Sequence, residues 1–242
     1  MMDVRIFKSA QEAAQAGANL IEEVVLGKDQ PILGLATGST PIPMYQALIQ
    51  KYEAGTLSFK NVRTFNLDEY IGLDGAHDQS YRYFMNTQLF DHVDIDHANT
   101  HVPSGIGADH AADAKAYDEA IEAAGGTDIQ VLGIGNNGHI GFNEPAEVFI
   151  KGTHIVDLTD STIDANTRFF ASRDEVPRQA ITMGMGAIMS ARKVLLLAFG
   201  PAKAQAIRDT LCGDIDPRVP ASILQLHPNV VVLLDEDAAS LL

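Results

Sequence analysis

The sequence that decides the fold is Asp128-Ile-Gln-Val-Leu132, followed by Gly133-Ile-Gly135-Asn-Asn137-Gly138-His139-Ile-Gly141-Phe-Asn143-Glu144-Pro145. The first run is short, contains β-branched residues and comes after a pair of glycines, which is typical of a buried strand in a parallel sheet. The glycine-rich segment then brings one imidazole and one carboxylate close together. Because ligands of parallel sheets bind beyond the carboxyl ends of the strands, we interpret this segment as an active-site loop.

The spacing Gly133-x-Gly135-x-x-Gly138 also matches the dinucleotide-binding fingerprint. That fingerprint requires a helix to begin at the third glycine, where its free N–H groups hold a pyrophosphate. Gly141 and Pro145 follow almost at once, and both residue types disfavour a helix. We therefore predict a loop here and no dinucleotide site.

Strand-like and helical patterns alternate along the rest of the chain. Strands are expected at residues 1–7, 31–36, 62–66, 100–102, 128–132, 153–158, 194–199 and 230–235. Helices are expected at residues 9–26, 41–55, 79–92, 108–124, 163–170, 201–212 and 220–226, with a polar loop at residues 67–78. This alternation predicts an α/β fold: a doubly wound, mostly parallel sheet with right-handed crossovers and helices on both faces. No linker divides the chain, so residues 1–242 are expected to form one catalytic domain, with a mobile lid near residues 150–180.

Charge and composition limit the partners of the protein. Its 17 Lys and Arg stand against 32 Asp and Glu, and a net charge of −15 repels nucleic acid and anionic membranes. An anionic small substrate would need a locally basic pocket. Cys212 is the single cysteine, which excludes an internal disulfide and fits a reducing compartment. The start of the chain lacks a signal-peptide pattern, and no apolar run reaches the roughly 20 residues of a membrane span, so we expect a cytoplasmic protein.

A candidate phosphate site lies at Thr37-Gly38-Ser39-Thr40-Pro41, between a predicted strand and a predicted helix. Free amides, hydroxyl groups and the positive end of the helix dipole all favour an anion there. A plain helix cap is the alternative, and Thr40 alone would satisfy it. Because a glycine and three hydroxyl groups exceed what capping needs, we favour a phosphate cup formed by Gly38, Ser39 and Thr40.

Two cations are candidates to complete an anion site. Lys203 is expected in the first turn of a helix, where a cation opposes the helix dipole and so suggests a bound anion nearby. Arg168 lies between Thr167 and aromatic residues on a predicted helix, and its pattern fits a surface ion pair as well as a bidentate phosphate ligand.

The candidate acid and base groups are carboxylates and one histidine. Asp68 and Glu69 follow a predicted strand directly, and either could be a general base or a cap for the backbone of the following loop. Glu144 lies close to His139 in the chain, and a carboxylate beside an imidazole fixes its tautomer and favours its charged form. The other histidines show no metal-ligand spacing, so we expect no metal. Since the chain also lacks a Gly-x-Ser-x-Gly elbow, acid/base chemistry on an anionic substrate remains.

Five segments together resemble the glucosamine-6-phosphate deaminase (glucosamine-6-phosphate isomerase) family. They are Leu35-Ala-Thr-Gly-Ser-Thr-Pro41, Phe65-Asn-Leu-Asp-Glu-Tyr70, Gly135-Asn-Asn-Gly-His-Ile-Gly-Phe-Asn-Glu-Pro145, Thr167-Arg-Phe-Phe170 and Leu224-Gln-Leu-His-Pro228. The resemblance covers nearly the whole chain in order. It implies conversion of glucosamine 6-phosphate and water to fructose 6-phosphate and ammonia, without a metal or an organic cofactor.

The resemblance also implies roles for individual residues. Asp68 would be the base that moves the C2 proton during isomerisation. His139 would open the pyranose ring, with Glu144 to orient and charge it. Gly38, Ser39 and Thr40 would hold the phosphate, with Arg168 and Lys203 closing on the same group. Two alternatives have the same kind of sheet: a 6-phosphogluconolactonase-like hydrolase, and a non-catalytic phosphosugar-binding effector module of a transcriptional regulator.

One departure from the family concerns regulation. Allosteric members that respond to N-acetylglucosamine 6-phosphate carry small hydroxyl and basic residues just after the Asn-Glu-Pro string, plus a C-terminal extension. The corresponding positions here hold Glu147, Val148, His154 and Val156. We therefore expect a monomer or small homo-oligomer without this allosteric site.

The second departure generates a prediction. Well-known members of the family carry an aspartate at the position of Asn137, which can orient an imidazole by hydrogen bonding but cannot supply charge. Because Glu144 still supplies a carboxylate, activity should survive, and Asn137→Asp should alter the pH profile of turnover only slightly. A large gain in rate in this variant would show that the native chain lacks a group it needs.

Overall fold

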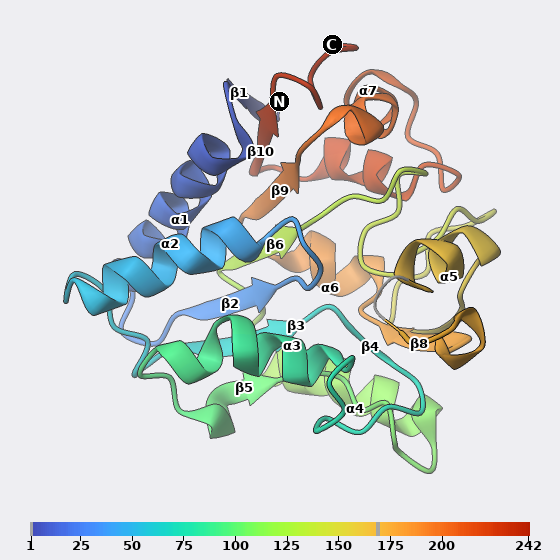
Figure 1. The fold of residues 1–242 in the computed structure, drawn as a ribbon, viewed down its shortest axis with the longest axis horizontal. Coiled ribbons are helices and arrows are strands. Elements are labelled where there is room, and N and C mark those ends of the chain that lie inside the picture. The colour runs from blue at the N-terminus through green and yellow to red at the C-terminus, as the bar shows by residue number, and fades with distance from the viewer. Residues whose placement is uncertain (1, 168–169) are drawn as a thin grey trace.

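A seven-stranded sheet forms the centre of the molecule (Figure 1). The structure is a computed structural model and describes residues 2–167 and 170–242. The strand order is β1-β10-β9-β6-β2-β3-β5, and every neighbouring pair is parallel, which confirms the predicted sheet. The strands are β1 (Asp3–Phe7), β2 (Ile32–Leu35), β3 (Arg63–Asn66), β5 (Thr100–His101), β6 (Ile129–Leu132), β9 (Val194–Ala198) and β10 (Val230–Asp235).

Helices flank the sheet on both faces, as predicted. In Figure 1, α1, α2 and α3 follow one another over the near face, while α6 lies behind β6. The α-helices are α1 (Ala10–Leu26), α2 (Ile42–Glu53), α3 (Tyr81–Gln88), α4 (His110–Ala123), α5 (Asp160–Asn166), α6 (Met185–Ser190) and α7 (Ala204–Cys212). Short 3-10 helices are η1 (Phe90–His92), η2 (His97–Asn99), η4 (Arg173–Glu175), η5 (Pro201–Lys203) and η6 (Pro220–Leu226). Within the described part of the chain, the helices are too short or too polar to cross a bilayer.

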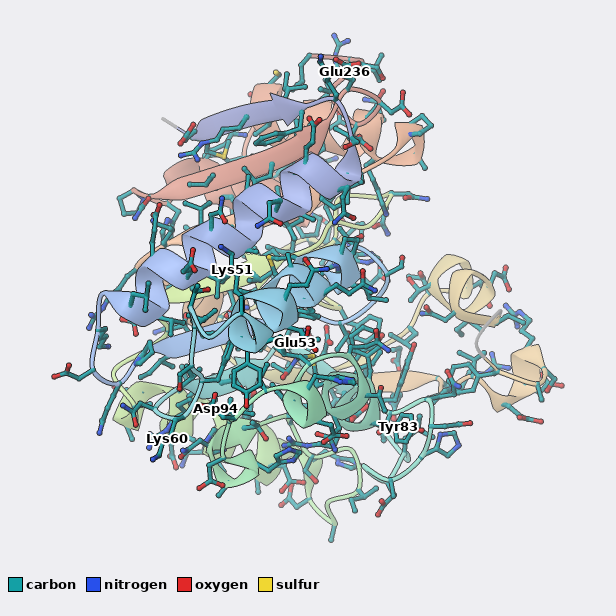
Figure 2. The ribbon with its side chains drawn as sticks, turned by 60° about the vertical axis from the view of Figure 1, so that its left-hand side comes forward. Lys51, Glu53, Lys60, Tyr83, Asp94 and Glu236 are labelled. Carbon is teal, nitrogen blue, oxygen red and sulfur yellow. The ribbon has the colours of Figure 1, made fainter. Side chains whose placement is uncertain are left out.

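Local sequence explains how the first helices begin and pack. The side chain of Ser9 accepts a hydrogen bond from the Glu12 amide at 3.2 Å and so caps α1. The helix then buries an alanine-rich face, which lets it pack closely beside α2. Lys51 on α2 reaches back to Glu22 on α1 at 2.8 Å, on the side of the molecule seen in Figure 2.

A second, smaller sheet was not predicted. It has the order β4-β8-β7 and is antiparallel, with β4 at Asp68–Tyr70, β8 at Gln179–Thr182 and β7 at His154–Asp157. The expected polar loop at residues 67–78 is therefore wrong at its start, because β4 is buried and pairs with β8. Neither β8 nor α6 was predicted from the sequence.

Three predicted helices differ in type or extent. Residues 201–203 and 220–226 form 3-10 turns, and the regular helix α7 begins only at Ala204. The helix expected at residues 163–170 begins earlier, at Asp160, where Thr159 accepts a hydrogen bond from the Thr162 amide and caps it. Residues 168 and 169 of that prediction lie outside the described part of the chain.

The order in which the chain adds strands to the sheet reverses at the neighbouring strands β2 and β6. After β2 the chain continues to β3 on one side, whereas after β6 the parallel sheet continues to β9 on the other side. The connections that leave these two neighbouring strands therefore diverge and open a crevice at the carboxyl edge. Both candidate loops follow these strands, so the topology alone brings them to one place.

Candidate active site

A cavity of about 430 Å³ opens at the divergence of β2 and β6. The loop after β2, the loop after β6, the first residue of β4 and helix α5 all contribute to its wall. Its described lining is Ala36, Thr37, Gly38, Ser39, Thr40, Leu67, Asp68, Tyr81, Gly133, Ile134, Gly135, Asn136, Asn137, His139, Gly141, Phe142, Thr162, Asn166 and Lys203. The structure thus gathers all but three of the candidate residues at one cavity: Glu69 and Glu144 are not in the described lining, and Arg168 lies outside the described residues.

The loop after β2 has the features of an anion site. Gly38 has a φ of +87°, a backbone conformation that favours glycine, and it turns the chain into α2. Pro41 occupies the N-cap of α2, and among the described residues no side chain caps this end of the helix. The hydroxyl groups of Ser39 and Thr40 are thus not used for capping, which supports the phosphate cup over the plain helix cap.

Lys203 reaches the same cavity from the other side of the crevice. It ends the 3-10 turn η5, directly before α7, so its expected place in the first turn of a regular helix is corrected. Gly200 begins this turn at a φ of +84°, and its amide is held by the Asp235 carboxylate. The Lys203 ammonium donates to Oδ1 of Asn136 at 2.8 Å, which places a cation beside the glycine loop.

The neighbouring carboxylates of Asp68 and Glu69 lie in different surroundings. The Glu69 carboxylate accepts the backbone N–H groups of Tyr70, Tyr81 and Arg82 at 2.8–2.9 Å and so caps α3. Asp68 lines the cavity with an exposed fraction of 6%. The sequence allowed each carboxylate to be a general base or a backbone cap. In the structure Glu69 is the cap, and Asp68 is available for proton transfer.

Burial sets the acidity of Asp68. Desolvation raises the pKa of its carboxyl to about 8, the neighbouring Glu69 carboxylate acts in the same direction, and a hydrogen bond with the Thr37 side chain opposes both. A Cβ added at Gly141 would lie 3.4 Å from Oδ2 of Asp68, so the glycine loop passes directly beside this carboxylate. A general base works best when its pKa lies near the working pH, as it does here.

The glycine loop turns back on itself and presents His139. No helix follows Gly138, whose φ of +84° turns the chain, so the predicted loop is confirmed and the dinucleotide fingerprint lacks its helix. The imidazole of His139 packs over Gly135, where a Cβ would collide with the ring. Glycine at position 135 is therefore needed for the histidine to face the cavity.

The carboxylate of Glu144 lies beside the imidazole of His139. Its Oε2 lies 3.5 Å from Nδ1 of the imidazole, longer than an ordinary hydrogen bond. Oε2 also accepts the Asn137 amide at 2.8 Å, and Oε1 accepts the Thr162 hydroxyl. Burial raises the pKa of Glu144, but the interaction with His139 and the hydrogen bonds from Thr162 and Asn137 outweigh it and lower the value to about 2. Glu144 is therefore a fixed negative charge behind the imidazole.

Asn137 acts differently from the sequence-based expectation. Its Oδ1 accepts the backbone N–H of His139 at 3.2 Å, and its Nδ2 donates to Glu144. The side chain thus orients the loop and the carboxylate rather than the imidazole ring, so the expectation of a direct bond to the ring is corrected. An aspartate has no proton for the contact with Glu144.

Several residues that line the cavity were not predicted from the sequence. Tyr81 begins α3 and stacks against Phe142 with an interplanar angle of 11°. Thr162 and Asn166 come from α5, inside the segment expected to be a lid. An isolated hydroxyl or amide on a predicted helix carries no local signal, because its role depends on which distant loop packs against it. Among the described residues, no group of three or more His, Cys, Asp or Glu side chains is arranged to hold a metal ion.

The chain is similar to known proteins along nearly its whole length. The family described as glucosamine-6-phosphate isomerases/6-phosphogluconolactonase matches residues 7–233. A curated protein of Thermoanaerobacter pseudethanolicus named glucosamine-6-phosphate deaminase is 51% identical over 241 residues, which cover 100% of this chain and 95% of that protein. A solved structure described as a monomeric glucosamine-6-phosphate deaminase is 43% identical with a TM-score of 0.97, and the match covers 100% of both chains.

A more distant likeness concerns the fold alone. The solved 6-phosphogluconolactonase of Thermotoga maritima has a TM-score of 0.78 but only 19% sequence identity, over 97% of this chain and 100% of that one. The same framework therefore occurs in proteins named for a different activity, and the residues of the site rather than the topology must distinguish the two activities.

The anion site can be tested with inorganic phosphate. We predict that Lys203→Met weakens phosphate binding roughly tenfold, because a charge-assisted hydrogen bond is lost. Isothermal titration calorimetry would measure the affinity. Lys51→Met is the matched control, since that ammonium pairs with Glu22 between α1 and α2, and it should bind phosphate as the wild type does. Equal affinity in all three proteins would remove Lys203 from the site.

Proposed function

The chain belongs to the family of glucosamine-6-phosphate isomerases and 6-phosphogluconolactonases, and we propose that it acts as a glucosamine-6-phosphate deaminase in amino-sugar catabolism. The overall reaction takes glucosamine 6-phosphate and water to fructose 6-phosphate and ammonia. The observation that carries this assignment is the convergence of Asp68, His139 and an anion cup on one cavity. The relatives that match the full chain at about half identity carry this name, which supports the proposal.

The phosphate of the substrate binds first in the proposed mechanism. Gly38, Ser39 and Thr40 present backbone amides and hydroxyl groups to it, and the Lys203 ammonium supplies charge. Arg168 is proposed as a further phosphate ligand on the strength of its sequence match. With the phosphate fixed at this end, the sugar extends toward Asp68 and His139.

Ring opening and isomerisation follow. His139 donates a proton to the ring oxygen, the bond from C1 to that oxygen breaks, and the neutral imidazole takes the proton of the C1 hydroxyl, which yields the open-chain aldehyde. Asp68 then takes the proton from C2, an acidic carbon beside the carbonyl, and a proton is delivered to C1. The resulting C2 imine adds water, and ammonia leaves as the C2 ketone forms. Glu144 lies beside the His139 imidazole through these steps, and Asn137 holds the loop and the Glu144 carboxylate in place.

The two alternatives fit the chain less well. Similarity to lactonases reaches only the fold, at 19% identity in the example above. A non-catalytic sensor would be free to lose its acid and base groups, but Asp68 and His139 both face the cavity and Glu144 supports the imidazole. We further propose that the enzyme works in the cytoplasm, without a nucleic-acid or membrane partner and without a cofactor.

The assignment is tested by measuring both products. Purified protein should release ammonium and fructose 6-phosphate from glucosamine 6-phosphate in a one-to-one ratio. Asp68→Asn should lower turnover at least about a hundredfold, because an amide cannot accept the C2 proton. 6-Phosphogluconolactone is the control substrate. Hydrolysis of the lactone without turnover of the amino sugar would assign the chain to the neighbouring activity instead.

Regulation gives a separate prediction. We propose that the protein is a monomer or small oligomer without an N-acetylglucosamine 6-phosphate site, because Glu147, Val148, His154 and Val156 replace the residues of the allosteric members. The solved relative at 43% identity is described as monomeric. Initial rates should follow a hyperbola in substrate, with or without the N-acetyl sugar phosphate. A sigmoidal curve that this ligand abolishes would contradict the proposal.

A further inference from the structure

The shorter of two hydroxyl contacts between the start of helix α5 and the glycine loop comes from Thr162; the other comes from Thr159, at 3.5 Å from Oε1 of Glu144. The Thr162 side chain donates to Oε1 of Glu144 at 2.5 Å. Both side chains are largely shielded from water, since Thr162 is 7% exposed and the side chain of Glu144 is 8% exposed. A hydrogen bond to a charged group in such a place is strong, because water cannot replace it.

The opposite oxygen of Glu144 is shared. Asn137 donates to Oε2 at 2.8 Å, and Nδ1 of His139 lies 3.5 Å from the same atom. Within the described part of the structure, Nδ1 of the imidazole has no hydrogen-bond partner at a normal distance. A small rotation of the carboxylate therefore decides how closely it approaches the histidine, and Thr162 is the contact that controls this rotation from the Oε1 side.

The position of α5 is itself fixed from two sides. Arg173 binds Asp160 and Asp164 on the outer surface of the helix, at 2.6 Å each. The helix also follows β7 directly, and β7 belongs to the small sheet whose strand β4 begins with Asp68. In Figure 1, α5 and β8 lie together at the right of the molecule, beside the end of the sheet that carries β4. Helix α5, which supplies Thr162, is thus connected through β7 and β8 to β4, which begins with Asp68.

We propose that Thr162 is a positioning residue for the ring-opening step: its hydroxyl holds the Glu144 carboxylate in the orientation that faces the His139 imidazole. This proposal rests on the proposed function and names a residue of α5 through which the segment 150–180 acts on the chemistry. Thr162 also lines the cavity, so the contact is made at the edge of the substrate site.

Few other groups compete for Glu144. His139 is the described titratable side chain that pairs with it, and the remaining contacts come from Asn137, Thr159 and Thr162, which do not titrate. The acids of α5 face Arg173, and the Lys203 ammonium bonds Asn136. Asp68 lines the same cavity, and burial raises its pKa to about 8, so the pH dependence of kcat/KM also contains the Asp68 titration. The NMR titration therefore reports on the Glu144 carboxyl separately from Asp68.

The test uses two variants at position 162 and one control on the same helix. Thr162→Val keeps the shape of the side chain but removes the hydroxyl, and Thr162→Ser restores it. Thr167→Val is the control, because the Thr167 hydroxyl bonds only the backbone carbonyl of Ile163 among the described contacts. The measurements are the pH dependence of kcat/KM and a carbon-13 NMR titration of the Glu144 carboxyl, assigned with Glu144→Gln.

Thr162→Val should lower kcat about tenfold, since it loses a hydrogen bond to a charged group. It should also move the Glu144 titration to higher pH, because the hydrogen bond from the Thr162 hydroxyl helps to lower that pKa. Thr162→Ser should recover both, and Thr167→Val should match the wild type. A wild-type Glu144 titration and kcat in Thr162→Val, or equal loss in Thr162→Ser, would overturn the proposal. Because the NMR titration needs no substrate, it judges Thr162 even if the wild type fails to deaminate the sugar.

Discussion

The pairing of β2 with β6 is the constraint on which the active site depends. These parallel strands are neighbours in the sheet, with Leu33 opposite Ile129. The next strand after β2 is added on one side of this pair, and the next parallel strand after β6 is added on the other side. The loops at their carboxyl ends are thereby held side by side with space between them. The anion cup comes from one loop and His139 from the other, so the distance between the two ends of the substrate is set by the sheet rather than by flexible segments.

The small antiparallel sheet adds Asp68, the proposed base, to the wall of the cavity. Asp68 pairs with Thr182 of β8, and the Thr182 hydroxyl accepts the amide of Phe142 in the glycine loop at 3.0 Å. The base and the histidine loop are therefore joined by a short path of backbone and hydroxyl contacts. Burial in this corner gives Asp68 its basicity, because the charged carboxylate has little water to stabilise it.

Much of this arrangement could be predicted from local pattern. The run at residues 128–132 and the glycines after it indicated a strand and a loop, and the cup residues lay between a strand and a helix. Strand β4 was missed because Asp68-Glu69-Tyr70 is short and polar, and it becomes a strand only through pairing with β8. The role of Thr162 could not be predicted, since its contact with Glu144 joins segments that no sequence pattern connects. The same holds for the Asn137 amide, whose partner depends on the fold of the loop.

The central claim is that burial at the sheet edge keeps Asp68 basic enough to take a proton from carbon at neutral pH. Its most direct test is a carbon-13 NMR titration of the aspartate carboxyl groups in the free protein, with the Asp68 signal assigned by its loss in Asp68→Asn. The account predicts a midpoint near pH 8. A midpoint near 3.8, the ordinary value for an aspartate, would contradict it and show that water reaches this carboxylate freely.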